Sequence, residues 1–221
     1  SDKFVIDQFI MDGGKVLWFV DPLDVNRDSL YRTGETFGIS ANLNIEKDMI
    51  FKYGARLNAD MIIDKECGPI YIPGHPLGIV DWYFYPLAQR SEHPITKNID
   101  PIKGEYTSSV EIVNKDDKNV TKTVLLQSSS NAQIFKTPAR VNYGIVDVEP
   151  NFNKGKPEDA EFPIAIMLEG NFTSAFENRM PEALLNNPDF NTKFKSDTTK
   201  MLVVSDGDII RNEVDSKVQD G

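Results

Sequence analysis

A chain of 221 residues can form one large domain or two small ones, and 40% hydrophobic with 26% charged residues is the composition of a folded protein. The 34 acidic residues outnumber the 24 basic ones and give a net charge of −10. This charge excludes nucleic acid as an expected partner and disfavours electrostatic docking on anionic lipid, because both need a basic face.

The first 64 residues alternate between helical and strand patterns. Apolar residues on one face predict a helix that ends at Gly13-Gly14, where glycine acts as a C-cap. A continuous apolar run follows and stops at Asp21-Pro22, which is typical of a strand covered on both faces. We predict, in chain order, a helix over 4–11, a strand Lys15–Val20, a long loop over 23–46, a short helix Lys47–Gly54 and a strand Leu57–Asp64.

The middle of the chain is less regular. Gly68–Gly78 contains several prolines and glycines and is predicted to be a loop. Trp82–Leu87 (WYFYPL) is strongly β-prone, but Pro86 predicts a sheet edge or a strand end, with the aromatic side chains forming a core wall or an exposed edge. Tyr106–Val113 and Lys122–Gln127 flank a polar tip, so they form either a hairpin or two strands joined by a surface excursion.

Two short apolar runs near the C-terminus, Phe162–Leu168 and Lys200–Val204, are the most secure strands together with Lys15–Val20. A charged loop is predicted over Asn151–Glu161 and a short helix near Pro181–Leu185. Alternating helices and strands indicate the α/β class. We therefore expect an open, mostly parallel sheet of about four to six strands, with helices on its faces and long loop excursions.

Ser205-Asp206-Gly207-Asp208 follows the last of these strands and is the sharpest candidate for a functional site. Two carboxylates one residue apart at a strand end can hold a hard cation or transfer protons. They can also form an ordinary turn in which Asp206 or Asp208 caps the next element. The sequence leaves these alternatives open, since no histidine or cysteine lies near and no further carboxylate follows until Glu213.

The other reactive residues point to structure more than to chemistry. Cys67 is the single cysteine, so an intrachain disulfide is excluded, and the neighbouring acids Asp64 and Glu66 should raise its pKa rather than activate it. The sequence contains no phosphate-binding glycine motif and no metal-ligand spacing of histidines, so neither a cofactor nor a metal is expected. Ser128 and Ser129 follow the VLLQ strand, where α/β proteins place ligand contacts, although a hydrophilic connection is the simpler explanation.

Several stretches spread over nearly the whole chain carry a family resemblance, and none of them is a catalytic signature. They are FVIDQFIMDGGKVLWFVD (4–21), FKYGARLNADMIID (51–64), WYFYPL (82–87), HPITKNID (93–100), KTVLLQSS (122–129), TPARVNYG (137–144), FPIAIMLEGNFTSAF (162–176) and VVSDGDIIRN (203–212). Together they resemble the soluble region of the gliding-motility-associated ABC-transporter protein family (GldG) and, more broadly, the auxiliary-domain family found beside bacterial ABC exporters.

The resemblance implies a Rossmann-like, glutamine-amidotransferase-like α/β domain without that enzyme's nucleophile. It also implies a non-enzymatic accessory component on the periplasmic side of the bacterial inner membrane, with an ABC permease and ATPase as partners and an unknown small molecule or peptide as a possible substrate. Because the chain begins in the middle of a helix–strand pattern, we expect residues 1–221 to be one domain of a longer, membrane-anchored protein.

Four residues remain as candidate ligand contacts: Ser128, Ser129, Asp206 and Asp208. One alternative function is an α/β domain that processes carbohydrate or peptide. Another is a metal-dependent hydrolase that uses Asp206 and Asp208.

Overall fold

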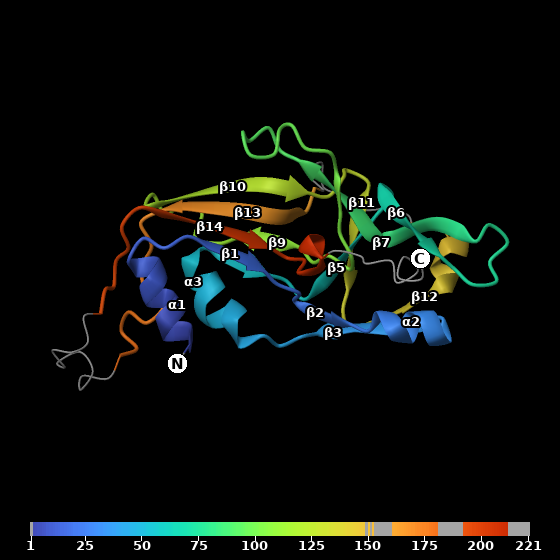
Figure 1. The fold of residues 1–221 in the computed structure, drawn as a ribbon, viewed down its shortest axis with the longest axis horizontal. Helices are drawn as coiled ribbons and strands as arrows, with labels where there is room; N and C mark the ends of the chain where they lie inside the picture. The colour runs from blue at the N-terminus through green and yellow to red at the C-terminus, as the bar shows by residue number, and fades with distance from the viewer. Residues whose placement is uncertain (1, 149, 151, 153–160, 181–191, 212–221) are drawn as a thin grey trace, which may run out of the picture.

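The computed structural model describes residues 2–148, 150, 152, 161–180 and 192–211, and its dominant feature is one long sheet (Figure 1). The strand order is β1-β14-β13-β10-β7-β6, and β8 pairs with β7. These strands are β1 Val16–Phe19, β6 Cys67–Tyr71, β7 Ile79–Arg90, β8 Ile102–Lys103, β10 Val120–Gln127, β13 Pro163–Gly170 and β14 Thr199–Val204. The three apolar runs that the sequence marks as secure strands are thus confirmed and lie side by side.

The strand directions overturn the predicted Rossmann-like, mostly parallel sheet. Within the described part of the large sheet, β1 and β14 pair in parallel, whereas β13 pairs antiparallel with β14 and β10, and β7 pairs antiparallel with its three neighbours. The continuous apolar run of β13 arises because this central strand is covered on both faces. Ile166 and Leu168 of β13 face one core, and Ile164 and Met167 face another. Burial on both faces does not require parallel strands.

Three small antiparallel sheets replace much of the predicted loop and helix content. They pair β12 with β3 and β3 with β2, β5 with β11, and β4 with β9. Their bounds are β2 Leu23–Val25, β3 Glu35–Ser40, β4 Ala55–Leu57, β5 Asp60–Asp64, β9 Val110–Ile112, β11 Ala132–Lys136 and β12 Ala139–Asn142. The molecule is therefore mostly β.

The predicted loop over 23–46 was wrong, because this segment holds β2, α2 (Arg27–Thr33) and β3. The side chain of Asn26 accepts a hydrogen bond from Ser29 N at 2.9 Å and so caps α2. Gly34, with φ 77°, ends the helix in the left-handed conformation that glycine favours.

The remaining helices are short and mostly cover one face of the large sheet. In Figure 1, α1 and α3 lie on the same side of β1, β14 and β13. Their apolar residues Ile10, Met11 and Tyr53 pack in the same core as Ile166 and Leu168 of β13. The bounds are α1 Asp2–Met11, the π-helical η1 Glu46–Ile50, α3 Phe51–Tyr53, and the 3₁₀ helices η2 Tyr143–Asp147 and η3 Asp208–Ile210. The predicted helices over 4–11 and 47–54 are confirmed, while that near Pro181–Leu185 lies outside the described residues.

The proline-rich middle of the chain forms strands that the sequence does not indicate. Residues 67–71 are β6, although Gly68–Gly78 was predicted to be a loop. WYFYPL lies within β7, between β10 and β6, so it is not an edge strand. Pro86 is accommodated opposite Cys67, next to the register shift between Cys67 and Pro69. β9 and β10 belong to different sheets, so they are joined by an excursion and form no hairpin with each other.

Candidate functional site

The carboxyl ends of the parallel pair β1 and β14 bring two acidic turns together. Phe19 and Val204 are the last paired residues of these two strands. The turn that follows β1 and holds Asp21 therefore lies beside the turn that follows β14 and holds Asp206. The backbone N–H of Gly207 donates to Asp21 Oδ1 at 2.6 Å and joins the two turns. Burial raises the pKa of Asp21. The predicted strand-end location of Asp206 is therefore correct, although the sheet around it is not parallel.

Asp206 is fully buried, and both of its carboxylate oxygens accept hydrogen bonds. Oδ2 accepts from Glu105 N at 2.8 Å and from Thr107 Oγ1 at 2.7 Å. Oδ1 accepts from the backbone N–H groups of Asp208 and Ile209 at 2.9 and 3.1 Å. Burial disfavours the charged form more than these bonds favour it, and it raises the pKa of Asp206 to about 6.

Glu105 is the centre of a small charge network next to Asp206. Its side chain is 6% exposed and forms ion pairs with Arg27, with Lys103 at 3.1 Å and with Arg211 at 3.1 Å. Asp208 lies at the edge of the same network, 3.3 Å from Arg211 and 3.9 Å from Arg27. A buried carboxylate with three cationic neighbours is well compensated, which favours a structural role.

A polar cavity of about 160 Å³ lies beside this network, lined by Asp21, Asp24, Arg27, Glu105 and Asp208 among others. Typical ligand pockets enclose at least about 300 Å³, so this one has room for water or a single small group. Within the described residues, no three histidine, cysteine, aspartate or glutamate side chains are placed to hold a metal ion. Asp206 and Asp208 also point to different partners, and this geometry gives no support to the metal-dependent alternative.

The candidates Ser128 and Ser129 belong to a different part of the molecule and are buried. Ser128 exchanges hydrogen bonds with Phe162 at the start of β13, and both bonds are 2.9 Å. Ser129 donates from its hydroxyl to Asp64 Oδ1 at 2.5 Å and from its backbone N–H to Asp64 Oδ2 at 2.8 Å. These bonds attach the segment after β10 to β5 and β13, and they do not bring the serines to the same partners as Asp206.

Other buried aspartates also accept hydrogen bonds from a hydroxyl group and a backbone N–H. Asp7 is fully buried and accepts from Tyr53 Oη at 2.8 Å, from Ser174 Oγ at 2.7 Å and from Ala175 N at 2.7 Å. Asp206 is thus one of several aspartates that tie a distant loop to the core through a hydroxyl and a backbone N–H. This repetition favours a structural role for the Asp206 contacts.

Cys67 is half buried, and the predicted direction of its pKa shift is correct, although Asp81 rather than Glu66 acts beside Asp64. Burial, reinforced by Asp81 and Asp64, raises the pKa of its thiol to about 12. A thiol with so high a pKa is protonated at neutral pH and is a poor nucleophile. The two histidines lie in separate turns, where the Nδ1 atoms of His75 and His93 accept from the backbone N–H groups of Leu77 and Ile95.

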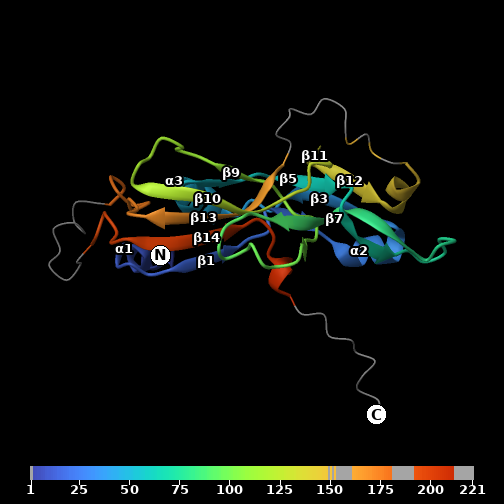
Figure 2. The ribbon, with the colours of Figure 1, turned by 90° about the horizontal axis from the view of Figure 1, so that it is seen from above.

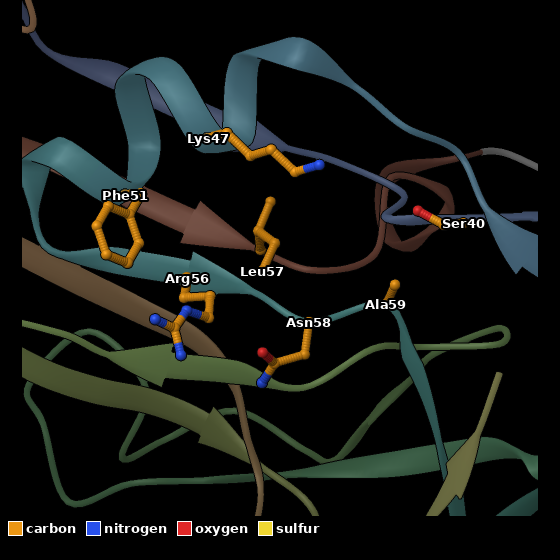
Figure 3. A pocket seen from close by; sticks show the side chains of 7 residues that line it. All are labelled: Ser40, Lys47, Phe51, Arg56, Leu57, Asn58 and Ala59. Atoms are coloured by element: carbon orange, nitrogen blue, oxygen red, sulfur yellow. The ribbon is translucent and has the colours of Figure 1, made fainter.

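A larger cavity of about 450 Å³ lies where the end of β3, the η1–α3 segment and the connection from β4 to β5 meet (Figure 3). In this view Lys47 extends above Leu57, Phe51 and Arg56 lie on one side, and Ser40 lies on the other. The lining residues are Ser40, Lys47, Phe51, Arg56, Leu57, Asn58 and Ala59. The volume falls within the usual range for small-molecule sites.

The charge of this cavity is opposite to that of the whole chain. Among the lining side chains that the structure describes, two are cationic and none is a carboxylate, whereas the chain carries a net charge of −10. Arg56 is held by Glu111 at 2.9 Å and stacks over Phe51, with its guanidinium carbon 5.2 Å from the ring centroid. Leu57 supplies an apolar floor, so the arrangement suits a ligand that joins an anionic group to an apolar body.

Sequence reasoning missed this cavity and also missed the partners of Asp206. Lys47 and Arg56 belong to segments predicted as a helix and a helix–strand connection, and no spacing rule links them to Ser40. Glu105 and Thr107 lie about a hundred residues before Asp206, in a segment with no recognisable motif. Only the tertiary fold brings these groups together.

Comparison with known proteins places the chain in a transport family. Residues 1–221 match the family described as "ABC-type uncharacterized transport system", the ABC-transporter auxiliary family. A relative from Borreliella burgdorferi, described as an uncharacterized protein, is 24% identical over 178 residues, which cover 79% of this chain and 34% of the relative. The chain thus spans about a third of that relative's length. No solved structure matches. The chain belongs to the ABC-transporter auxiliary family, whose members are components of an ABC-type transport system.

Proposed function

We propose that this domain is the non-enzymatic accessory part of an ABC transport system of the gliding-motility type, and that it works on the periplasmic side of the inner membrane. Its task there is to capture an anionic small molecule or peptide and to contact the permease and ATPase of the transporter. The observation that carries the binding role is the cavity beside Lys47 and Arg56, which places two cationic side chains together in a strongly acidic chain.

Charge and shape support an anionic ligand with an apolar part. Lys47 is exposed and Arg56 is about half exposed, so both cations can reach a bound carboxylate or phosphate. Phe51, which is 39% exposed, and the buried Leu57 offer the apolar surface beside them. The acidic surface elsewhere should repel an anion. Binding is therefore favoured at the cavity, beside Lys47 and Arg56.

The geometry at Asp206 supports a role without catalysis. A general base needs a lone pair directed at the substrate, and the two oxygens of Asp206 already accept four hydrogen bonds from the protein. Asp208 faces Arg211 and Arg27 rather than an open cavity of ligand size. Neither carboxylate is placed as the alternative hydrolytic function would require.

Isolation of the full-length protein from membranes tests the accessory role. We expect the permease and the ATPase of one transport system to co-purify with it after mild detergent extraction, well above their recovery with an unrelated membrane protein. Equal recovery in both purifications would contradict the role. An alkaline phosphatase fusion, which is active only after export, tests the periplasmic location, and an inactive but intact fusion would contradict that location.

An anionic aromatic probe, 8-anilinonaphthalene-1-sulfonate, tests the cavity. Replacing Lys47 and Arg56 together by glutamine should weaken binding of the probe by about tenfold, because each exposed charge contributes up to about 1 kcal/mol. Lys52→Gln is the matched control, since this exposed lysine lies in the same helical segment but does not line the cavity. An equal effect of the control and the double variant would refute a specific anion site.

A further inference from the structure

The turn between β6 and β7 forms one end of the molecule. In Figures 1 and 2, which share the long axis, the connection from β6 to β7 reaches the same extreme of that axis. The two strands pair from Pro69 opposite Asp81 to Tyr71 opposite Ile79, and the chain turns between them. We call residues 69–80 the hairpin tip. Its convex position lets a flat surface approach it without meeting the rest of the fold.

The hairpin tip is unusual in this chain because it lacks charge. From Cys67 to Val80 the sequence CGPIYIPGHPLGIV contains no aspartate, glutamate, lysine or arginine, although 26% of the whole chain is charged. Three large apolar side chains on the tip are also exposed, namely Tyr71 at 61%, Leu77 at 77% and Ile79 at 63%. Tyr71 and Ile79 are cross-strand neighbours, so two of these side chains lie on the same face.

The backbone of the tip satisfies nearly all of its own hydrogen-bond donors. Pro73 and Pro76 have no N–H, and five of the other six N–H groups between Ile72 and Ile79 donate within the tip. The bonds run from Ile72 N to Gly78 O (2.8 Å), His75 N to Ile72 O (3.2 Å), Leu77 N to His75 Nδ1 (3.2 Å), Gly78 N to His75 O (2.9 Å) and Ile79 N to Leu77 O (2.7 Å). Pairing these donors internally lowers the free-energy cost of removing the tip from water.

We propose that the hairpin tip inserts into the headgroup–hydrocarbon boundary of a lipid bilayer. A specific protein interface carries roughly one hydrogen bond per 100–200 Å². Most backbone N–H groups of the tip are already paired within it, so few donors remain for such a partner. A bilayer needs only apolar side chains, and the amphipathic ring of Tyr71 suits its interface. The net charge of −10 restricts the insertion to zwitterionic rather than anionic lipid.

Vesicle partitioning tests this proposal directly. A tryptophan at position 77 (L77W) reports on its surroundings, and its emission should shift to shorter wavelength when phosphatidylcholine vesicles are added. Phosphatidylglycerol vesicles should give a weaker shift at the same lipid concentration, because they repel the acidic chain. These titrations are independent of the anion cavity, so either proposal can fail without the other.

A double variant, Leu77→Ser with Ile79→Ser, should lower partitioning into phosphatidylcholine vesicles by at least about tenfold, since it removes two apolar side chains from hydrocarbon. Leu17→Ser on β1 is the matched control, because Leu17 is 66% exposed yet lies outside the tip. Far-UV circular dichroism confirms that each variant folds. The proposal is overturned if the wild-type chain does not partition into the vesicles, or if Leu17→Ser reduces partitioning as strongly as the double variant does. It is also overturned if the double variant keeps vesicle binding and loses co-purification with the permease.

Discussion

Thr107→Val is the most informative single change at the strand-end turn. Thr107 is fully buried and donates its hydroxyl to Asp206 Oδ2 at 2.7 Å. Valine has nearly the same shape, so the substitution removes one donor to a buried carboxylate and leaves packing almost unchanged. The carboxylate keeps its other three hydrogen bonds, and the loss isolates the contribution of this one contact.

The size of the loss should depend on pH. At pH 8 Asp206 is ionised, and a hydrogen bond to a charged group contributes roughly 2 kcal/mol to the free energy of unfolding. At pH 4.5 Asp206 is protonated in the folded state, so the same substitution should cost about 1 kcal/mol. The difference of about 1 kcal/mol corresponds to a further rise in the pKa of Asp206 by roughly 0.7 unit in the variant.

Urea denaturation at the two pH values measures both losses, and carboxyl NMR measures the pKa of Asp206. Thr36→Val serves as the control, because Thr36 is 2% exposed and its hydroxyl has no hydrogen-bond partner among the residues that the structure describes. We expect that control to be neutral or slightly stabilising at both pH values. Equal losses for Thr107→Val at pH 8 and pH 4.5, or a lowered pKa of Asp206, would refute the assignment.

Three further predictions concern the wild-type titration and two other contacts. The pKa of Asp206 rises from 3.8 in the unfolded chain to about 6 in the fold. Its contribution to stability is therefore complete below about pH 4, and the free energy of unfolding should fall by about 3 kcal/mol as pH rises through 6. Denaturation curves of the Asp206→Asn variant should lack this trend. Gly170→Ala should lower the free energy of unfolding by several kcal/mol, since φ is 146° and the added Cβ would lie 2.0 Å from the carbonyl oxygen of Asn119. A melting temperature near that of the wild type would contradict this expectation. Ser129→Ala should cost roughly 1.5–3 kcal/mol by leaving Asp64 without its hydroxyl donor, and unchanged urea stability would argue that Ser129 is not structural.

The sequence predicts where the main strands lie but not how they run. Apolar runs identify β1, β13 and β14. Most side chains of β13 and β14 are buried, whereas β1 buries Trp18 and leaves Leu17 exposed. Whether a neighbour is parallel or antiparallel depends on connections made far away in the chain, and no local pattern records it. The segment over 23–46 was misread for a different reason. Its helix and strands are short, so the cap at Asn26 and the stop at Gly34 were its main signals.

The candidate site was foreseen in part. A polar turn after a buried strand is visible in the sequence, so the position of Asp206 at a strand end could be predicted. Its hydrogen-bond donors come from Glu105 and Thr107, in a segment without regular structure, and such long-range contacts leave no spacing signal. The cavity beside Lys47 and Arg56 depends in the same way on the meeting of three separate segments.

The pairing of β1 with β14 joins the two ends of the chain and therefore sets an order of events during synthesis. Val16 pairs with Met201, and at roughly 5–20 residues per second the roughly 185 residues between them take about 10–40 seconds to emerge from the ribosome. During that time Met11 and Trp18 lack the β14 partners that bury them in the finished core. These side chains therefore reach their final partners only after the last strand of the sheet has been made.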